Sequence, residues 1–416
     1  APIAAQASDS LNHDGMNSYV RSERNSQRID SKTFVNQVNE ELATLEDRVD
    51  GLQDPQYDFE AGSFSDTTAL DGKAIFALGA IDGADTLGKS QALTASYVYQ
   101  MNLNTSFTGD DNLYVRLKTG DGWSGIWDSK PGTYHIESFS GTAEVLKVDK
   151  MWYTFPVTDK LTATVGPKIE NYYMLAATPS VYKPGALKAF KLGGHGAAFG
   201  ASTSTGAGLK YLGDNGFAAG ITANSKGANS GTKGLFTKQD QNKVNTQVAY
   251  TQDNYHVSAT YSLQRGWNSW GYFSTKDANN GSDSTNVKSE SLALRAWWRP
   301  DETGTATPSV SAGYDVMNFT GHTVLDASGY TLAFNWEDMF QADDKIGFAI
   351  GQPIKATRAS AGNSLSEVDP FIWEAYYSFR PNDSIEVTPA IFGGTDVYEN
   401  TDEDLFGAVV TTTFKF

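Results

Sequence analysis

Most of the chain alternates between apolar and polar residues in short segments. In the segment 289–299, for example, Leu294 and Trp298 share one face, while Arg295 and Arg299 share the other. A period of two places successive side chains on opposite faces of a β-strand. One apolar and one polar face is typical of a half-buried antiparallel strand. The pattern therefore predicts an all-β protein.

Sixteen such segments can be counted after residue 54, and the connections between them alternate between short and long. The segments are centred near residues 75, 98, 115, 148, 165, 210, 220, 248, 259, 294, 313, 333, 348, 375, 388 and 410. An up-and-down barrel has this order of connections, whereas a soluble sandwich has no reason to alternate loop length. We therefore predict a 16-stranded antiparallel transmembrane β-barrel over residues 54–416.

Aromatic residues gather where the predicted strands approach the short connections. Trp297 with Trp298 and Tyr376 with Tyr377 are two examples. Such positions are typical of an interface girdle, although strands are rich in aromatics in any protein. The last predicted strand ends on Phe416, which looks like the terminal signal of bacterial outer-membrane barrels.

The N-terminal part follows a different pattern. Residues 1–30 are polar and without periodicity, so we predict a flexible segment. Residues 31–53 carry apolar positions spaced alternately three and four apart, which is the seam of a coiled-coil helix. This predicted seam consists of Val35, Val38, Leu42, Leu45, Val49 and Leu52. A single amphipathic helix lying on another surface is the alternative.

Composition narrows the chemistry. The chain has no Cys, only five His and a formal net charge of −17, so Cys-based metal sites and nucleic-acid binding are not expected. The sequence lacks a G-x-S-x-G elbow and a phosphate-binding loop, so we predict no enzyme, no catalytic residues and no cofactor. Acidic pairs such as Asp110–Asp111 and Asp343–Asp344 lack the spacing of a calcium loop. We expect solvated turns there, and no metal site.

The chain resembles the major outer-membrane porins of cyanobacteria, which are distantly related to carbohydrate-selective porins. The resemblance covers about residues 31–416 and is carried by the coiled-coil segment, Phe64–Phe76, Tyr172–Gly200 and Val410–Phe416. It implies a homotrimer surrounded by outer-membrane lipid, with the N-terminal helix in the periplasm. It also implies a third long loop, at about 171–206, that folds into the pore.

The same resemblance implies passive passage of inorganic ions and small hydrophilic solutes. Many members of the family carry an N-terminal S-layer-homology domain that grips the cell wall. We expect that full domain to be missing, so that contact with peptidoglycan would fall to the short N-terminal segment.

Strand parity predicts which charged side chains face the pore. The predicted lining and constriction residues are Lys183, Lys188 and Lys191 on the third long loop, and Arg116, Lys118, Lys168, Arg295, Arg299, Glu374 and Arg380 on strands. Fixed charge in a narrow aqueous passage sets ion preference, and low-dielectric walls strengthen it. Because cations outnumber anions on this face, we predict a mild preference for anions.

Two other functions are compatible with a β-rich chain. One is a structural envelope barrel with a closed pore, which would tether the outer membrane to the cell wall. The other is a secreted, soluble adhesin or binding module. Single-channel conductance separates an open porin from a closed barrel, and heat-modifiable migration on a denaturing gel separates both from a soluble protein.

Overall fold

The structure is a computed structural model. It describes residues 67–82, 92–121, 141–194, 196, 198–199, 203–267, 275–279, 284–366, 369–396 and 404–416. The predicted flexible segment 1–30 and the predicted coiled-coil helix 31–53 lie outside the described residues, so both stay predictions.

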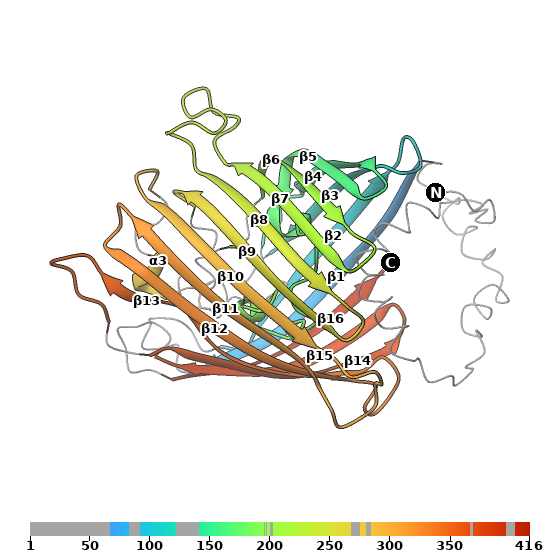
Figure 1. The fold of residues 1–416 in the computed structure, drawn as a ribbon. Coiled ribbons are helices and arrows are strands. Elements are labelled where there is room, and N and C mark those ends of the chain that lie inside the picture. Colours follow the sequence, from blue (N-terminus) through green and yellow to red (C-terminus); the bar gives the residue numbers. More distant parts are fainter. Residues whose placement is uncertain are drawn as a thin grey trace.

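Within the described residues, sixteen strands form one closed antiparallel barrel in which each strand pairs with its sequence neighbours (Figure 1). The strands are β1 (Thr68–Asp82), β2 (Thr94–Thr105), β3 (Asn112–Gly120), β4 (Lys147–Thr158), β5 (Leu161–Glu170), β6 (Thr203–Leu212), β7 (Phe217–Ser225), β8 (Asn242–Thr251), β9 (Tyr255–Arg265), β10 (Lys288–Trp298), β11 (Ser309–Thr320), β12 (Val324–Glu337), β13 (Lys345–Ala359), β14 (Phe371–Asn382), β15 (Ile385–Thr395) and β16 (Leu405–Lys415). The helical segments are η4 (Asn171–Met174), η5 (Lys188–Phe190) and α3 (Lys276–Asn279). Every predicted strand centre falls inside a strand, and the predicted 16-stranded barrel is confirmed.

The barrel closes between its first and last strands. Strand β1 pairs with β16 along ten residue pairs, from Lys73 opposite Lys415 to Asp82 opposite Phe406. The backbone of Phe416 extends this pairing, because Gly72 and Phe416 exchange two hydrogen bonds of 2.8 and 3.1 Å. The last residue of the chain therefore takes part in closing the barrel.

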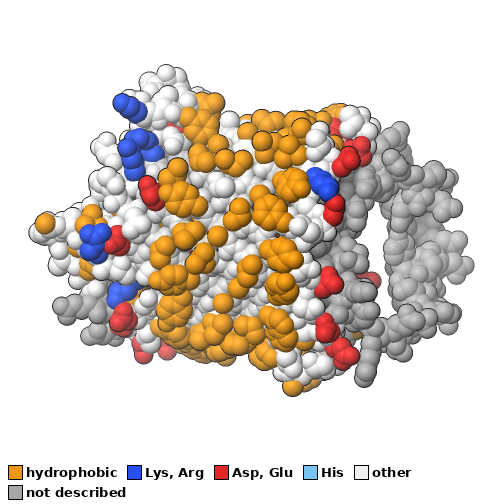
Figure 2. Space-filling view, in the orientation of Figure 1, with side chains coloured by type: hydrophobic (Ala, Val, Ile, Leu, Met, Phe, Trp, Pro, Cys, Tyr) orange, Lys and Arg blue, Asp and Glu red, His pale blue; other side chains and the backbone are white. Residues whose placement is uncertain are grey.

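Large apolar side chains cover the outer surface. On β9, Val257 and Leu263 are exposed, whereas the intervening Ser258 and Ser262 are buried on the inner face. Together, such residues form an apolar band with charged side chains at both of its ends (Figure 2). In a soluble sandwich the apolar faces would meet in a dry core. Apolar outside and polar inside is the arrangement of a barrel in lipid.

The predicted aromatic girdle needs one correction. Trp297 and Tyr376 are buried on the inner face, while Trp298 is exposed on the outer face and Tyr377 is half-buried there. Adjacent residues on a strand point to opposite faces, so only one member of each pair can reach lipid.

The long connection between β9 and β10 enters the barrel at the end opposite the short turns. The helical turn α3 packs against β12 and β13, where Ala278 is buried beside Val324 and Ile354. The backbone N–H of Thr275 donates to the carbonyl of Ile354 at 2.9 Å. Among the described residues, no helix is both long and apolar enough to cross a bilayer.

Candidate functional site

The third long connection, between β5 and β6, lies inside the barrel. We call its continuously described part, residues 171–194, the inward loop. It begins with η4, which contacts β5, β6 and β7. Farther along the same wall, Gln247 on β8 exchanges two hydrogen bonds with the backbone of Ala177, at 3.0 and 3.1 Å. The indole N–H of Trp297 donates to the carbonyl of Thr178 at 3.2 Å.

A single buried carboxylate holds the middle of the inward loop. Glu374 on β14 accepts backbone N–H groups from Gly185 at 3.1 Å, Ala186 at 3.1 Å and Leu187 at 2.6 Å. It also accepts the hydroxyl of Tyr182 at 2.7 Å. Four donors converge on two oxygens, so this side chain acts as a latch between β14 and the loop.

A buried ion pair holds the far end of the inward loop. The guanidinium of Arg295 on β10 donates to the carbonyls of Leu192, at 2.9 Å, and Gly194. The same group pairs with Asp315 on β11 at 2.8 Å. Thr331 on β12 donates its hydroxyl to the carbonyl of Gly193 at 2.8 Å.

Apolar packing adds to these polar anchors. The central part of the loop contributes Tyr182, Leu187 and Phe190 to a buried cluster whose wall side includes Phe392 and Ile75. Burying a side chain of this size is worth about 1.5–3 kcal/mol. The loop is therefore fixed to the wall on one side by packing as well as by hydrogen bonds.

A cavity of about 1620 Å³ lies beside the inward loop. Its lining comes from β1 to β6, from β13 to β16 and from the loop itself. Within the described residues, none of the lining side chains comes from β7 to β12. This cavity therefore lies along the β1–β6 and β13–β16 side of the barrel.

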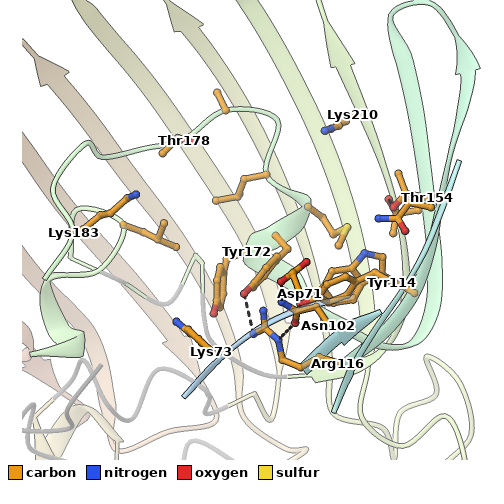
Figure 3. Close-up of a pocket in the computed structure, with 18 of the residues that line it drawn as sticks. Asp71, Lys73, Asn102, Tyr114, Arg116, Thr154, Tyr172, Thr178, Lys183 and Lys210 are labelled. Carbon is orange, nitrogen blue, oxygen red and sulfur yellow. Dashed lines mark hydrogen bonds between the residues drawn. The ribbon is translucent and has the colours of Figure 1, made fainter. Parts of the chain in front are cut away.

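A hydrogen-bonded network forms the strand side of this cavity (Figure 3). Asn102 donates to Asp71 at 2.6 Å and accepts from the guanidinium of Arg116 at 2.8 Å. The hydroxyl of Tyr114 donates to the same Asn102 oxygen at 2.9 Å. Arg116 also reaches the hydroxyl of Tyr173 on the loop at 3.4 Å. The network fixes polar groups of both kinds, donors and acceptors, at the cavity surface.

Aromatic rings continue from this network into the loop. The ring centroids of Tyr114 and Trp152 lie 4.6 Å apart, and those of Trp152 and Tyr173 lie 5.4 Å apart. Tyr172 follows at 5.0 Å from Tyr173, and the ammonium of Lys191 lies 5.0 Å from the Tyr172 centroid. All four rings line the cavity.

Charged groups of the lining are unevenly distributed. The cationic residues are Lys73, Arg116, Lys183, Lys210, Lys345, Arg380 and Lys415, and the anionic residues are Asp71, Asp110, Asp111, Asp159, Asp383 and Glu386. Four of the six carboxylates belong to short turns at the rim. The strands and the loop contribute seven cationic residues and two anionic ones, and the turns contribute the other four carboxylates. Arg380 and Lys415 both pair with Glu386, at 3.4 and 3.0 Å.

Three of the ten predicted lining residues border this cavity. These are Lys183, Arg116 and Arg380. Lys183 on the inward loop and Lys73 on β1 both project into it (Figure 3).

The structure places the other seven elsewhere. Arg295 and Glu374 lie between the loop and the wall, where they anchor the loop. Lys118 and Arg299 are buried, Lys168 is exposed beside a register shift in β5, and Lys188 and Lys191 are half-buried on the loop.

Sequence reasoning missed several cations that matter here. Lys150 on β4 is buried and pairs with Glu170 at 2.6 Å. Lys210 has the same parity as the inward-facing Ser204, which was the available signal. Lys415 alternates with Phe414 and Phe416 on the last strand, and this alternation was the available signal for an inward position.

The structure also bears on the acidic turns and on metal binding. Asp111 and Asp344 are buried, whereas Asp110 and Asp343 beside them are exposed, so each pair is only half solvated. In the part of the chain that is described, no group of three His, Asp or Glu side chains is arranged to hold a metal ion.

Comparisons with known proteins agree with this geometry. The family model of carbohydrate-selective porins, OprB family, matches residues 29–416. An uncharacterised protein of Nostoc is 27% identical over 414 residues, covering 90% of this chain and 70% of that protein. The high-pH structure of Pseudomonas putida OprB superposes with a TM-score of 0.58 at 12% identity, over 84% of this chain and 94% of the other. Salmonella typhi OmpF, in complex with daunomycin, gives a TM-score of 0.52 at 15% identity, over 84% and 97%.

Proposed function

This chain belongs to the OprB family of carbohydrate-selective porins and is an outer-membrane porin. From that premise we propose a passive, water-filled channel for small hydrophilic solutes and inorganic ions, narrowed by the inward loop and mildly selective for anions. The observation that carries the proposal is the cavity beside the inward loop, whose lining holds seven cationic residues and six anionic ones, with four of the carboxylates in short turns at the rim.

The charge of the lining supports the anion preference. A fixed charge beside a narrow passage with low-dielectric walls acts strongly on permeating ions. Three of the carboxylates at the rim, Asp110, Asp159 and Asp383, are exposed in turns where bulk water screens them more effectively, whereas Asp111 is buried. The net charge of −17 therefore describes the whole chain and does not set the sign of the passage.

The network on the strand wall supports passage of carbohydrates. Sugar hydroxyls both donate and accept hydrogen bonds, and Asp71, Asn102 and Arg116 offer both kinds of partner. Tyr114 and Trp152 also line the cavity, which places aromatic surface beside these polar groups. A wall of this kind suits a neutral or acidic sugar better than an apolar solute.

The test is the reversal potential of the purified full chain in a planar bilayer under a KCl gradient. We expect a potential on the anion-selective side, reduced in Lys183→Gln, whose side chain lines the cavity. Lys238→Gln, on an exposed loop outside the cavity, is the matched control and should leave the potential unchanged. A cation-selective potential in the unchanged chain would overturn the anion proposal.

Vesicle swelling in sugars of increasing size tests the carbohydrate part separately. Swelling that declines with sugar size supports a sieving channel. A protein with neither conductance nor swelling would instead support the closed structural barrel.

We also propose a homotrimer assembled with the help of the helix at residues 31–53. This rests on the heptad pattern, since those residues lie outside the described part of the chain. Chemical cross-linking of the full chain in membranes tests it, and Leu42→Lys should lower the yield of cross-linked trimer. A trimer yield unaffected by that substitution would leave the helix without this role.

A further inference from the structure

Two short turns share a sequence pattern that the channel function does not explain. The turn between β2 and β3 reads Phe-Thr-Gly-Asp-Asp at 107–111, and the turn between β12 and β13 reads Phe-Gln-Ala-Asp-Asp at 340–344. We call them the Phe-Asp turns. Both lie at the short-turn end of the barrel, and both lead into a strand that pairs with an aromatic-rich neighbour.

The last Asp of each turn binds the backbone of its own turn. Asp111 accepts the N–H groups of Phe107 and Thr108, both at 2.8 Å. Asp344 accepts those of Phe340, at 2.9 Å, and Gln341, at 3.1 Å. Both carboxylates are buried. The turn N–H groups are therefore satisfied inside the protein and need no water.

Each Asp also holds a tyrosine on the outer face of the barrel. The hydroxyl of Tyr153 donates to Asp111 at 2.6 Å, and that of Tyr377 donates to Asp344 at 3.0 Å. Trp152 and Tyr376, the neighbours of these tyrosines, line the inner cavity, so the tyrosines themselves face outward.

The phenylalanine of each turn packs on that tyrosine and is otherwise open. The ring centroids of Phe107 and Tyr153 lie 6.3 Å apart, and those of Phe340 and Tyr377 lie 5.8 Å apart. Phe107 is 65% exposed and Phe340 is 77% exposed. Each ring therefore extends the apolar outer surface toward the rim.

We propose that Phe107 and Phe340 are lipid anchors that insert into the interface of the periplasmic leaflet. The two rings continue the lipid-facing band through Tyr153 and Tyr377, which makes lipid the occupant that fits them. Placing a turn against lipid is costly when its N–H groups lose water without other partners. The buried Asp removes that cost, while the exposed Asp next to it stays in water.

The absence of Cys in the chain allows a direct test. Phe107→Cys and Phe340→Cys would each be labelled with an environment-sensitive dye and folded into phospholipid vesicles as full chains. Thr108→Cys and Gln341→Cys, at exposed neighbours in the same turns, are the matched controls. Heat-modifiable migration on a gel confirms that each variant has folded.

We expect blue-shifted emission at positions 107 and 340, with strong quenching by lipids that carry a nitroxide near the headgroup. The control positions should instead be quenched by aqueous iodide. Quenching of all four positions by iodide alone would overturn the proposal. Protection of 107 and 340 from both quenchers would also overturn it, because the rings would then be covered by protein.

A second variant tests the role of the carboxylate. Asp344→Ala in the labelled Phe340→Cys chain should shift the dye emission toward red and raise its quenching by iodide, because the turn is no longer held. Asp343→Ala, which changes the exposed neighbour, should do neither. An unchanged dye signal in Asp344→Ala would show that the buried Asp does not position the anchor.

Discussion

Replacing the latch residue Glu374 by Gln should loosen the inward loop without altering the size of the side chain. The carboxylate accepts three backbone N–H groups and the Tyr182 hydroxyl. An amide has one oxygen, and its NH₂ group would face donors. We therefore expect at least two of the four donors to lose their partner in the docked loop.

The magnitude follows from the number of donors. A buried donor without a partner costs about 1–3 kcal/mol. Two of them cost at least about 2 kcal/mol, which shifts the ratio of docked to undocked loop by about 30-fold. The anchors at Arg295 and Gln247 remain, so only the segment around residues 182–187 should detach.

Single-channel recording in a planar bilayer is the assay. We expect a noisier open current in Glu374→Gln, with excursions to a conductance different from that of the unchanged chain. Glu290→Gln is the control, since this carboxylate lies on the outer face of β10 and bonds only the Tyr261 hydroxyl among the contacts described, at 3.0 Å. Identical current noise in all three chains would refute the latch.

Three further changes have defined outcomes. Arg295→Met leaves Asp315 buried without its cation and should lower the free energy of unfolding by about 3–5 kcal/mol in urea titrations, with partial recovery on adding Asp315→Leu. Gly185→Ala puts a methyl group into the ring of Tyr376, so it should displace the loop and change the single-channel conductance despite its small size. Burial acts to raise the pKa of Asp111, but hydrogen bonds from its turn and from a tyrosine outweigh burial and hold that pKa well below its usual range. The ionised carboxylate of Asp111 therefore stabilises the folded state fully above the unfolded-state pKa of about 3.9, and this stabilisation is lost as the pH falls below that value. Asp111→Asn should accordingly reduce the difference between the urea midpoints measured at pH 7 and at pH 3.

The sequence predicted the barrel well because lipid imposes a simple rule on every strand. Residues such as Val257 and Leu263 must be apolar outward, and period-two alternation follows from that requirement alone. Strand parity also placed Arg295 and Glu374 on the inner side, where the structure has them.

The alternation of residues along a strand could not predict which part of the protein an inward-facing side chain contacts. Arg295 meets the inward loop and Arg116 meets the cavity, yet both belong to strands with the same alternation. The difference arises from a loop more than a hundred residues away from Arg295 in sequence. Likewise, Asp111 and Asp110 are identical in type, and only the turn geometry decides which of them captures backbone N–H groups.

Because the inward loop is held at a few anchor residues, side chains around a single ring of strands meet two different demands. A substitution at Lys210, which borders the cavity, changes the lining. A substitution at Arg295, which binds the loop backbone, disturbs the scaffold first. Neighbouring positions on the inner face can therefore tolerate change to very different degrees.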